Sequence, residues 1–432
     1  MNSTKVLRIR NVGFIATRIA GTDGVSLEIG KWARIIEDSG FDCFYVCATS
    51  DRPAERTFLI PEADFFHPEI REIYEEAFGR TTRPRDLSRR VDDLKQRIKS
   101  GLYAAVEEFQ LDALIAENVL TIPMNIPFGL ALTEFLFETG IPCIAHHHDF
   151  YWERSRFAVN AIRDYLSAAF PPRDDDIEHV VINSQASTEF SRRTGLSCRV
   201  IPNVMDFEHP PGPLDDYAKD FREAIGVGPD DFLILQPTRI VQRKGITHAI
   251  ELVRRLDDPR CKLVVSHDGR DEGDAYLKRI LSYAELMDVE LILAGDRISA
   301  ARGTAEDGSK RYSIWDVYQH ADLVTYPSTY EGFGNAFLEA IYFRKPLLCN
   351  RYSIFESDIL PYGFKVTLMD GFLDEEAVDS VRRILVDREF CQSCVDHNYE
   401  LGRQFFSYDR VRDELRTILE RRRPAGTPNN HG

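Results

Sequence analysis

Residues 328–340 have the sequence STYEGFGNAFLEA, with two carboxylates on either side of a glycine-containing turn. The preceding residues 322–327, DLVTYP, form an apolar run that ends at a proline, as expected of a buried strand. Residues 336–343 have the composition of a helix start. We therefore expect Glu331 in the loop at the carboxyl end of a strand, and Glu339 about one turn into the next helix.

This strand–loop–helix arrangement suits an anionic ligand. Ligands of open α/β sheets bind at the carboxyl ends of strands, and a helix N-terminus offers unpaired N–H groups there. Gly332 and Gly334, on either side of Phe333, would let the backbone approach a ligand without an intervening Cβ. The alternative is an ordinary connection in which Glu331 is solvated.

A second stretch, QPTRIVQRKG at residues 236–245, follows another apolar run and precedes a predicted helix. Arg239 and Lys244 would lie together at the carboxyl end of that strand, where two cations suit a diphosphate. The alternative is a pair of solvated surface cations, and for Arg243 we favour that interpretation.

Together the two stretches resemble the signatures of the family 4 retaining glycosyltransferases, which have the GT-B fold. Two positions depart from the family pattern, because Thr238 and Arg344 stand where the family usually has glycine. The resemblance implies that Glu331 contacts hydroxyls of the donor sugar and that Glu339 holds the ribose of the nucleotide. It also implies an α/β protein of two Rossmann-like domains that face a central cleft.

The hydrophobic pattern agrees with two α/β halves. A predicted strand at 6–15, a helix at 26–39 and a strand at 43–47 form a β-α-β unit, which predicts a parallel sheet. Charged, helical residues 52–110 are interpreted as helices inserted in this half. We expect an N-terminal acceptor domain at 1–205, a donor domain at 206–404, a C-terminal helix at 405–423 that packs back on the first domain, and a disordered tail at 424–432.

The first half contains two further candidate elements. The loop with Gly21 and Gly24 resembles the family's N-terminal loop near the donor phosphate, although a plain β–α turn is the alternative. Three consecutive histidines, residues 146–148, alternate in direction on an extended chain, so they cannot easily face one metal. The resemblance points to His148 as the residue that faces the donor sugar, and we expect His146 to be buried.

Candidate acceptor residues lie in the same half. Asn118 and Asn125 follow a strand and could hydrogen-bond sugar hydroxyls, although a loop-capping role is at least as good an interpretation. Tyr151 and Arg154, after the histidines, are candidates for an acceptor wall. These segments resemble those of transferases that build mannosylglucosylglycerate-type compatible solutes.

Composition argues against several classes of protein, including nucleic-acid-binding and membrane-spanning proteins. The formal net charge of −16 over 432 residues argues against general nucleic-acid binding. No apolar run reaches the roughly 18 residues of a membrane span, and the N-terminus lacks a signal core. The 8 cysteines are scattered, which favours a reduced, cytoplasmic protein.

We therefore expect a retaining hexosyltransferase that uses a nucleotide sugar, GDP-mannose first and UDP-glucose second, and a small soluble acceptor. The catalytic candidates are His148, Arg239, Lys244 and Glu331. The donor-binding candidates add Gly21, Gly24, Gly332, Phe333, Gly334 and Glu339. No cofactor and no metal are expected. The alternatives are a nucleotide-sugar epimerase of related fold and a non-catalytic nucleotide-sugar binding protein.

Overall fold

The computed structural model describes residues 9–21, 23–267 and 274–421. These residues form two compact units: unit 1 lies within Met1–Pro202 and Asp409–Gly432, and unit 2 is Asn203–Tyr408. Residues 6–8 of the first expected strand, 422–423 of the last expected helix and the expected disordered tail lie outside the described residues.

Unit 1 is built on a seven-stranded parallel sheet with the strand order β5-β3-β1-β6-β7-β8-β9. Its strands are β1 (Asn11–Ile15), β3 (Asp42–Cys47), β5 (Thr57–Leu59), β6 (Ala113–Glu117), β7 (Cys143–His147), β8 (Ile177–Val181) and β9 (Arg199–Val200), with a separate small pair, β2 (Arg18–Ile19) and β4 (Thr49–Ser50). The near-continuous apolar runs of the central strands fit a sheet covered on both faces.

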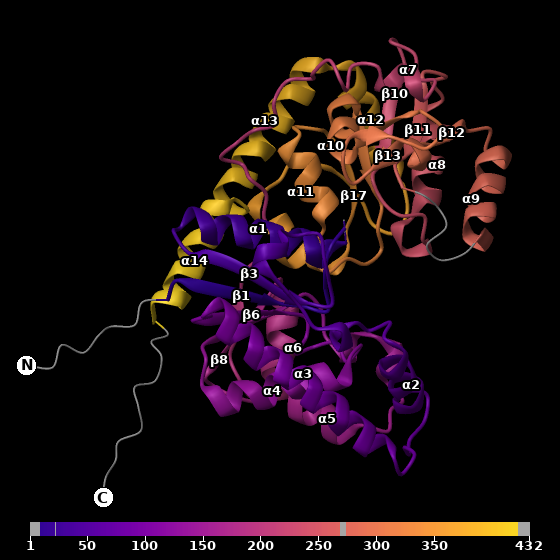
Figure 1. Ribbon diagram of the computed structural model, residues 1–432. Helices are drawn as coiled ribbons and strands as arrows, with labels where there is room; N and C mark the ends of the chain where they lie inside the picture. Colours follow the sequence, from indigo (N-terminus) through magenta and orange to yellow (C-terminus); the bar gives the residue numbers. More distant parts are fainter. Residues whose placement is uncertain (1–8, 22, 268–273, 422–432) are drawn as a thin grey trace, which may run out of the picture. The chain divides into compact units, whose positions relative to one another are not determined.

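Helices cover both faces of this sheet, with α1 on one face and α3 and α4 on the other (Figure 1). The helices are α1 (Gly24–Asp38), α2 (Pro68–Ala77), α3 (Leu87–Phe109), α4 (Ile126–Thr139), α5 (Arg163–Ala169), α6 (Ser184–Thr194) and α14 (Tyr408–Arg421). Leu102 of α3 and Phe128 of α4 pack with Ile15 and Val46 of the sheet in one buried core. In α14, Glu414 lies 3.4 Å from Arg199 of β9.

The sequence suggested that residues 52–110 contain helices alone, and the structure corrects this. The segment also contains β5, which extends the sheet by pairing Thr57 with Tyr45 of β3. A three-residue edge strand is too short to show a period of two, so the pattern gave no signal for it.

Unit 2 contains a six-stranded parallel sheet with the order β12-β11-β10-β16-β17-β18. Its strands are β10 (Phe232–Gln236), β11 (Cys261–Val265), β12 (Leu291–Leu293), β16 (Leu323–Tyr326), β17 (Leu347–Asn350) and β18 (Thr367–Met369). A separate small sheet consists of β13 (Ile298–Ser299), β14 (Gly303–Thr304) and β15 (Lys310–Ser313). Neither β18 nor the small sheet was predicted from the sequence.

The helices of unit 2 are α7 (Phe221–Ala224), α8 (Ile246–Leu256), α9 (Asp274–Leu286), α10 (Ile314–His320), α11 (Asn335–Tyr342), α12 (Glu375–Val386) and α13 (Arg388–Phe405). Ile250 of α8 and Val378 of α12 share a buried core with Leu263 of the sheet. None of the helices in the described residues is long and apolar enough to cross a membrane.

Strand order determines where the two sequence motifs lie. β10 and β16 are hydrogen-bonded neighbours, with Ile234 opposite Leu323, and both run in the same direction. The loops that follow them therefore leave the sheet at the same edge. This brings the cationic stretch after β10 next to the acidic stretch after β16.

Candidate active site

The loops after β10 and β16 are joined by backbone contacts. Thr329 donates its N–H to the carbonyl of Arg243 at 2.9 Å. Gly245 has a φ of +65°, and a Cβ at this position would lie 2.3 Å from the carbonyl oxygen of Pro327. Only glycine allows this approach without displacing the neighbouring loop.

Buried polar side chains hold the loop after β10 in its conformation. The Gln236 amide donates to the hydroxyl of Thr238 at 2.8 Å, and its Oε1 accepts from the hydroxyl of Thr325 at 2.7 Å. Thr238, which replaces the glycine expected from the family pattern, is thus a buried part of this network. The departure from the family pattern adds a hydrogen bond to the loop.

Glu331 is the carboxylate on which this site is built. It is 8% exposed, forms an ion pair with Lys244 and lies 3.3 Å from Arg243 Nη1. Arg243 also donates to the carbonyl of Tyr330 at 3.0 Å. The interpretation of Arg243 as a solvated surface cation was therefore wrong, because the loop after β16 brings a buried carboxylate to it.

The charges of these groups are coupled. Burial alone would raise the pKa of Glu331, but the charges of Lys244 and Arg243 hold it below its usual value, so Glu331 is ionised. Burial lowers the pKa of Lys244, and the positive charges of Arg243 and Arg239 act in the same direction. Glu331 pairs with two cations, Lys244 and Arg243, and Arg239 lies close enough for its charge to act on Lys244. Cations gathered in this way suit a diphosphate.

The turn before α11 is shaped by Gly334. Its φ is +124°, and a Cβ there would lie 2.3 Å from the hydroxyl of Tyr352, which donates to the Phe333 carbonyl at 2.7 Å. The ring of Phe333 is buried and meets Phe406 edge-on at 5.4 Å. A donor contact from Phe333 would therefore come from its backbone, as it would from Gly332.

Glu339 lies on the second turn of α11, as the sequence predicted. Its Oε2 accepts a hydrogen bond from the hydroxyl of Tyr318 at 2.8 Å. Tyr318 is fully buried on α10, so it fixes the direction of the carboxylate. Tyr318 could not be identified as this partner from the sequence, because it lies on a separate helix and no local pattern connects the two residues.

Unit 1 contains a buried cluster at the carboxyl ends of β6 and β7. Glu117 Oε2 lies 2.9 Å from His148 Nε2 and 3.0 Å from His146 Nδ1. The His146 ring stacks on Trp32 with centroids 4.0 Å apart, so this histidine is buried as expected. His147 points away from these two and lies 2.9 Å from His179.

Glu117 sets the protonation of His148. Burial opposes charge on His148, but the hydrogen bond and the negative charge of Glu117 raise its pKa. Burial lowers the pKa of His146, which is the neutral member of the pair. Glu117 was not among the predicted site residues, although a carboxylate at the end of the apolar run LDALIAE was a usable signal.

The same three side chains, Glu117, His146 and His148, could hold a metal ion, because their ligand atoms all lie within 4.8 Å of one another. The three consecutive histidines do not all face one point, since His147 faces the other way. Residues two apart face the same side, however, and the neighbouring strand adds the carboxylate of Glu117.

Replacing Glu117 with glutamine should lower the free energy of unfolding by about 1 kcal/mol or more at pH 6, and by less at pH 9. The ion pair stabilises the fold below the ordinary histidine pKa of about 6.5, and this contribution is lost as pH rises through the raised pKa of His148. Denaturant unfolding at both pH values measures the difference, with exposed Glu108→Gln as the control. A penalty that grows with pH would contradict this assignment.

The predicted acceptor asparagines are both engaged within the fold. Asn118 Oδ1 accepts from the His148 N–H at 2.9 Å, which holds the histidine loop in place. Asn125 caps α4 by accepting from the Phe128 N–H at 3.0 Å, and its Nδ2 donates to the Glu62 carbonyl at 2.8 Å. The loop-capping alternative thus describes Asn125, while its role toward an acceptor stays a prediction.

A pocket of about 310 Å³ lies beside this cluster in unit 1. Asn118, Asn125 and the predicted Arg154 line it, and so do Arg18 and Arg156, which the sequence analysis did not select. Tyr151 is not among its lining residues and packs instead with the apolar side chains of another cluster.

The glycine loop of unit 1 contributes to the same pocket. Asp23 caps α1 by accepting from the Ser26 N–H at 3.1 Å, and it lies 2.9 Å from Arg18. Gly21 has a φ of +79°, and its N–H donates to Asp51 at 2.9 Å. Gly24 is the first residue of α1. Their predicted contact with donor phosphate stays a prediction.

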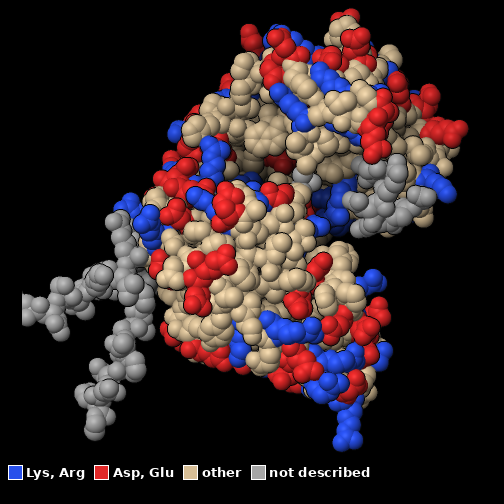
Figure 2. Space-filling view, viewed as in Figure 1, with Lys and Arg blue, Asp and Glu red and all other residues tan. Residues whose placement is uncertain are grey.

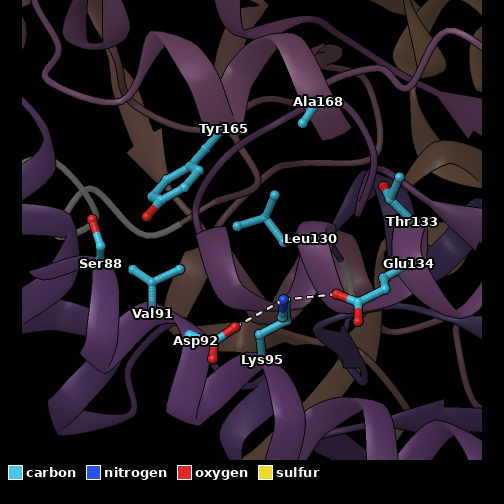
Figure 3. Close-up of a pocket in the computed structure, with 9 residues that line it drawn as sticks. All are labelled: Ser88, Val91, Asp92, Lys95, Leu130, Thr133, Glu134, Tyr165 and Ala168. Carbon is cyan, nitrogen blue, oxygen red and sulfur yellow. Dashed lines mark ion pairs between the residues drawn. The ribbon is translucent and has the colours of Figure 1, made fainter.

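A second pocket, of about 290 Å³, lies between α3, α4 and α5 (Figure 3). Its lysine, Lys95, lies between Asp92 at 2.9 Å and Glu134 at 2.7 Å. The positive charge is therefore already paired within the protein.

On the face shown in Figure 2, acidic and basic side chains are interspersed.

Comparisons with known proteins agree with this geometry. Residues 308–401 match the family model described as glycosyl transferases group 1. The chain is 32% identical over 392 residues to the mannosylglucosylglycerate synthase of Petrotoga mobilis, covering 84% of this chain and 88% of that protein. It is 31% identical over 425 residues to the synthase of the same name from Thermotoga maritima, covering 91% and 96%.

A solved structure shows the same fold. The Anabaena protein HepE, in complex with UDP and glucose, superposes with a TM-score of 0.61 at 16% identity, covering 96% of this chain and 100% of that one. Fold and site thus define a GT-B glycosyltransferase, an enzyme that transfers a hexose. Its similarity over most of both chains places it in a particular group: the chain belongs to the family of the mannosylglucosylglycerate synthases.

Proposed function

We propose that the protein is a retaining glycosyltransferase of family 4 that moves a hexose from a nucleotide sugar to a glucosylglycerate-type acceptor. GDP-mannose is the first candidate donor and UDP-glucose the second. The observation that carries the proposal is the ionised, buried Glu331 held by Lys244 and Arg243 at the carboxyl ends of β10 and β16. The names of the two relatives support a glucosylglycerate acceptor and a mannosyl donor.

Each group at this edge has a distinct role in the proposed reaction. Lys244 and Arg239 stabilise the diphosphate as it leaves, because fixed positive charge is most effective where negative charge develops. Glu331 keeps Lys244 and Arg243 in place before the donor binds. Its oxygens then accept hydrogen bonds from hydroxyl groups of the hexose. Glu339, oriented by Tyr318, accepts from the ribose. In unit 1, Glu117 holds His148, which orients the sugar.

A donor-by-acceptor screen tests the function. We expect turnover with GDP-mannose and glucosylglycerate, and NMR of the product should show that the anomeric configuration of the donor is kept. Donor incubated without acceptor controls for epimerisation. A new epimer in that control would instead favour an epimerase, and an inverted linkage would overturn the retaining mechanism.

We also propose that the reaction needs no divalent metal, so activity should persist in excess EDTA. Cationic side chains and the N-terminus of α11 can offset the diphosphate charge. Initial rates before and after chelation, with the metal content measured by mass spectrometry, test this. Loss of turnover that manganese or magnesium restores would contradict the proposal.

Such a loss would direct attention to two places. One is the group formed by Glu117, His146 and His148. The other is the acidic run at residues 174–176, where Asp174 Oδ1 accepts from the Asp176 N–H at 2.9 Å in a loop before β8. Glu117→Gln and Asp174→Asn would separate them.

A further inference from the structure

The pocket of unit 1 contains three arginines that are not equivalent. Arg18 lies 2.9 Å from Asp23, and Arg154 forms an ion pair with Asp149. For Arg156, no ion pair is found with any residue that the structure describes. Arg156 is therefore the arginine of this pocket whose guanidinium is available to form an ion pair with a ligand.

Arg156 is held at the pocket by its immediate neighbour. Phe157 is completely buried and meets the ring of Phe78 at 5.0 Å, which anchors the short helical turn Ser155–Phe157. The guanidinium carbon of Arg156 lies 4.7 Å from the Phe157 ring centroid. This stacking leaves the planar N–H edge of the guanidinium available to an anion.

The electrostatic environment also favours an anion here. Arg156 is an exposed residue, but its partial desolvation lowers its pKa, and the positive charge of Arg154 acts in the same direction, while Tyr74 and Asp149 oppose them. A bound negative charge would relieve both effects. The lining also includes the carboxylates of Glu117 and Asp23, whose oxygens can accept hydrogen bonds from sugar hydroxyls.

We propose that this pocket binds the acceptor and that Arg156, assisted by Arg154, holds an acceptor carboxylate by a bidentate contact. The inference rests on the proposed function, since a glycerate glucoside carries one carboxylate and several hydroxyls. A guanidinium fork matches the two oxygens of a carboxylate, whereas a neutral glycerol glucoside offers no such partner. Arg156 thus determines the specificity for acidic over neutral acceptors.

The test compares glucosylglycerate with glucosylglycerol, which has the same sugar but no carboxylate. In Arg156→Gln the ratio of kcat/KM values, acid over neutral, should fall by roughly tenfold to a hundredfold. Arg156→Lys keeps the charge but not the fork and should lie between wild type and Arg156→Gln. Arg192→Gln is the matched control, because this arginine is 74% exposed on α6 and does not line the pocket.

Calorimetric binding of glucosylglycerate separates this inference from the proposed function. If the wild type binds the acid, fails to transfer a hexose to it, and Arg156→Gln loses that binding, the inference stands and the proposed function fails. If the wild type turns over the acid and Arg156→Gln keeps the full preference for it, the inference is overturned and the function stands. An equal loss with both acceptors, or no binding of the acid by the wild type, would also overturn the inference.

Discussion

Replacing Lys244 or Arg239 with alanine should lower kcat by roughly a hundredfold or more, while the affinity for the nucleoside monophosphate changes little. In the proposed reaction both cations would face charge that grows as the diphosphate leaves, so their effect would belong chiefly to the transition state. Steady-state kinetics, combined with calorimetry of GMP and UMP, measures the two quantities separately. An intact kcat with a raised KM would mean that these residues bind ground state and transition state equally.

The two variants need different controls. Lys244 is ion-paired to buried Glu331, so its removal leaves a buried carboxylate whose remaining cationic partner, among the residues that the structure describes, is Arg243. Its melting temperature must therefore be compared with that of the wild type. Arg239 is exposed and gives the cleaner test. Arg254→Ala, whose side chain is 50% exposed near the other end of α8, controls for the loss of a cation from this region.

Replacing Glu339 with alanine should weaken binding of the nucleoside diphosphate by roughly tenfold to a hundredfold, the effect of about 1.5–3 kcal/mol for a charge-assisted hydrogen bond. The carboxylate on α11 would accept from the ribose hydroxyls. Titration calorimetry with GDP and UDP gives the dissociation constants. An unchanged constant in the variant would reject the ribose assignment.

Tyr318→Phe separates that role from a structural one. Tyr318 donates to Glu339 at 2.8 Å, so the phenylalanine removes the hydrogen bond but leaves the carboxylate. We expect Tyr318→Phe to retain most of the nucleotide affinity that Glu339→Ala loses. If both variants lose affinity equally, Glu339 acts through the orientation of α11 rather than by contacting the nucleotide.

Sequence reasoning predicted the fold from local patterns. The apolar runs that became β10 and β16 each end at a proline-containing loop, and the following helices begin where the patterns predicted them. It did not predict β5 or β18, each of which has only three residues and shows no periodicity of its own. For the 52–110 segment, the many charged positions of α3 obscured the strand that precedes it.

Only some residues of the candidate site could be predicted, because prediction depended on a recognisable local pattern. Glu331, Lys244 and Glu339 were selected because each stands in a stretch that resembles a known signature. Arg156 was not, since no pattern in its own stretch distinguishes it, and Glu117 was not, although it ends an apolar run. Their importance comes from what they face: a pocket in one case, and a histidine on the neighbouring strand in the other.

The sequence by itself determined the two α/β halves, the two motifs and the strand ends at which they lie, because hydrophobic periodicity and turn residues act over a few neighbouring positions. Only the tertiary structure decided which charges meet. Arg243 and Glu331 are 88 positions apart and come together because β10 and β16 are neighbours in the sheet. Strand order is set by the packing of the whole unit, so no local stretch contains it.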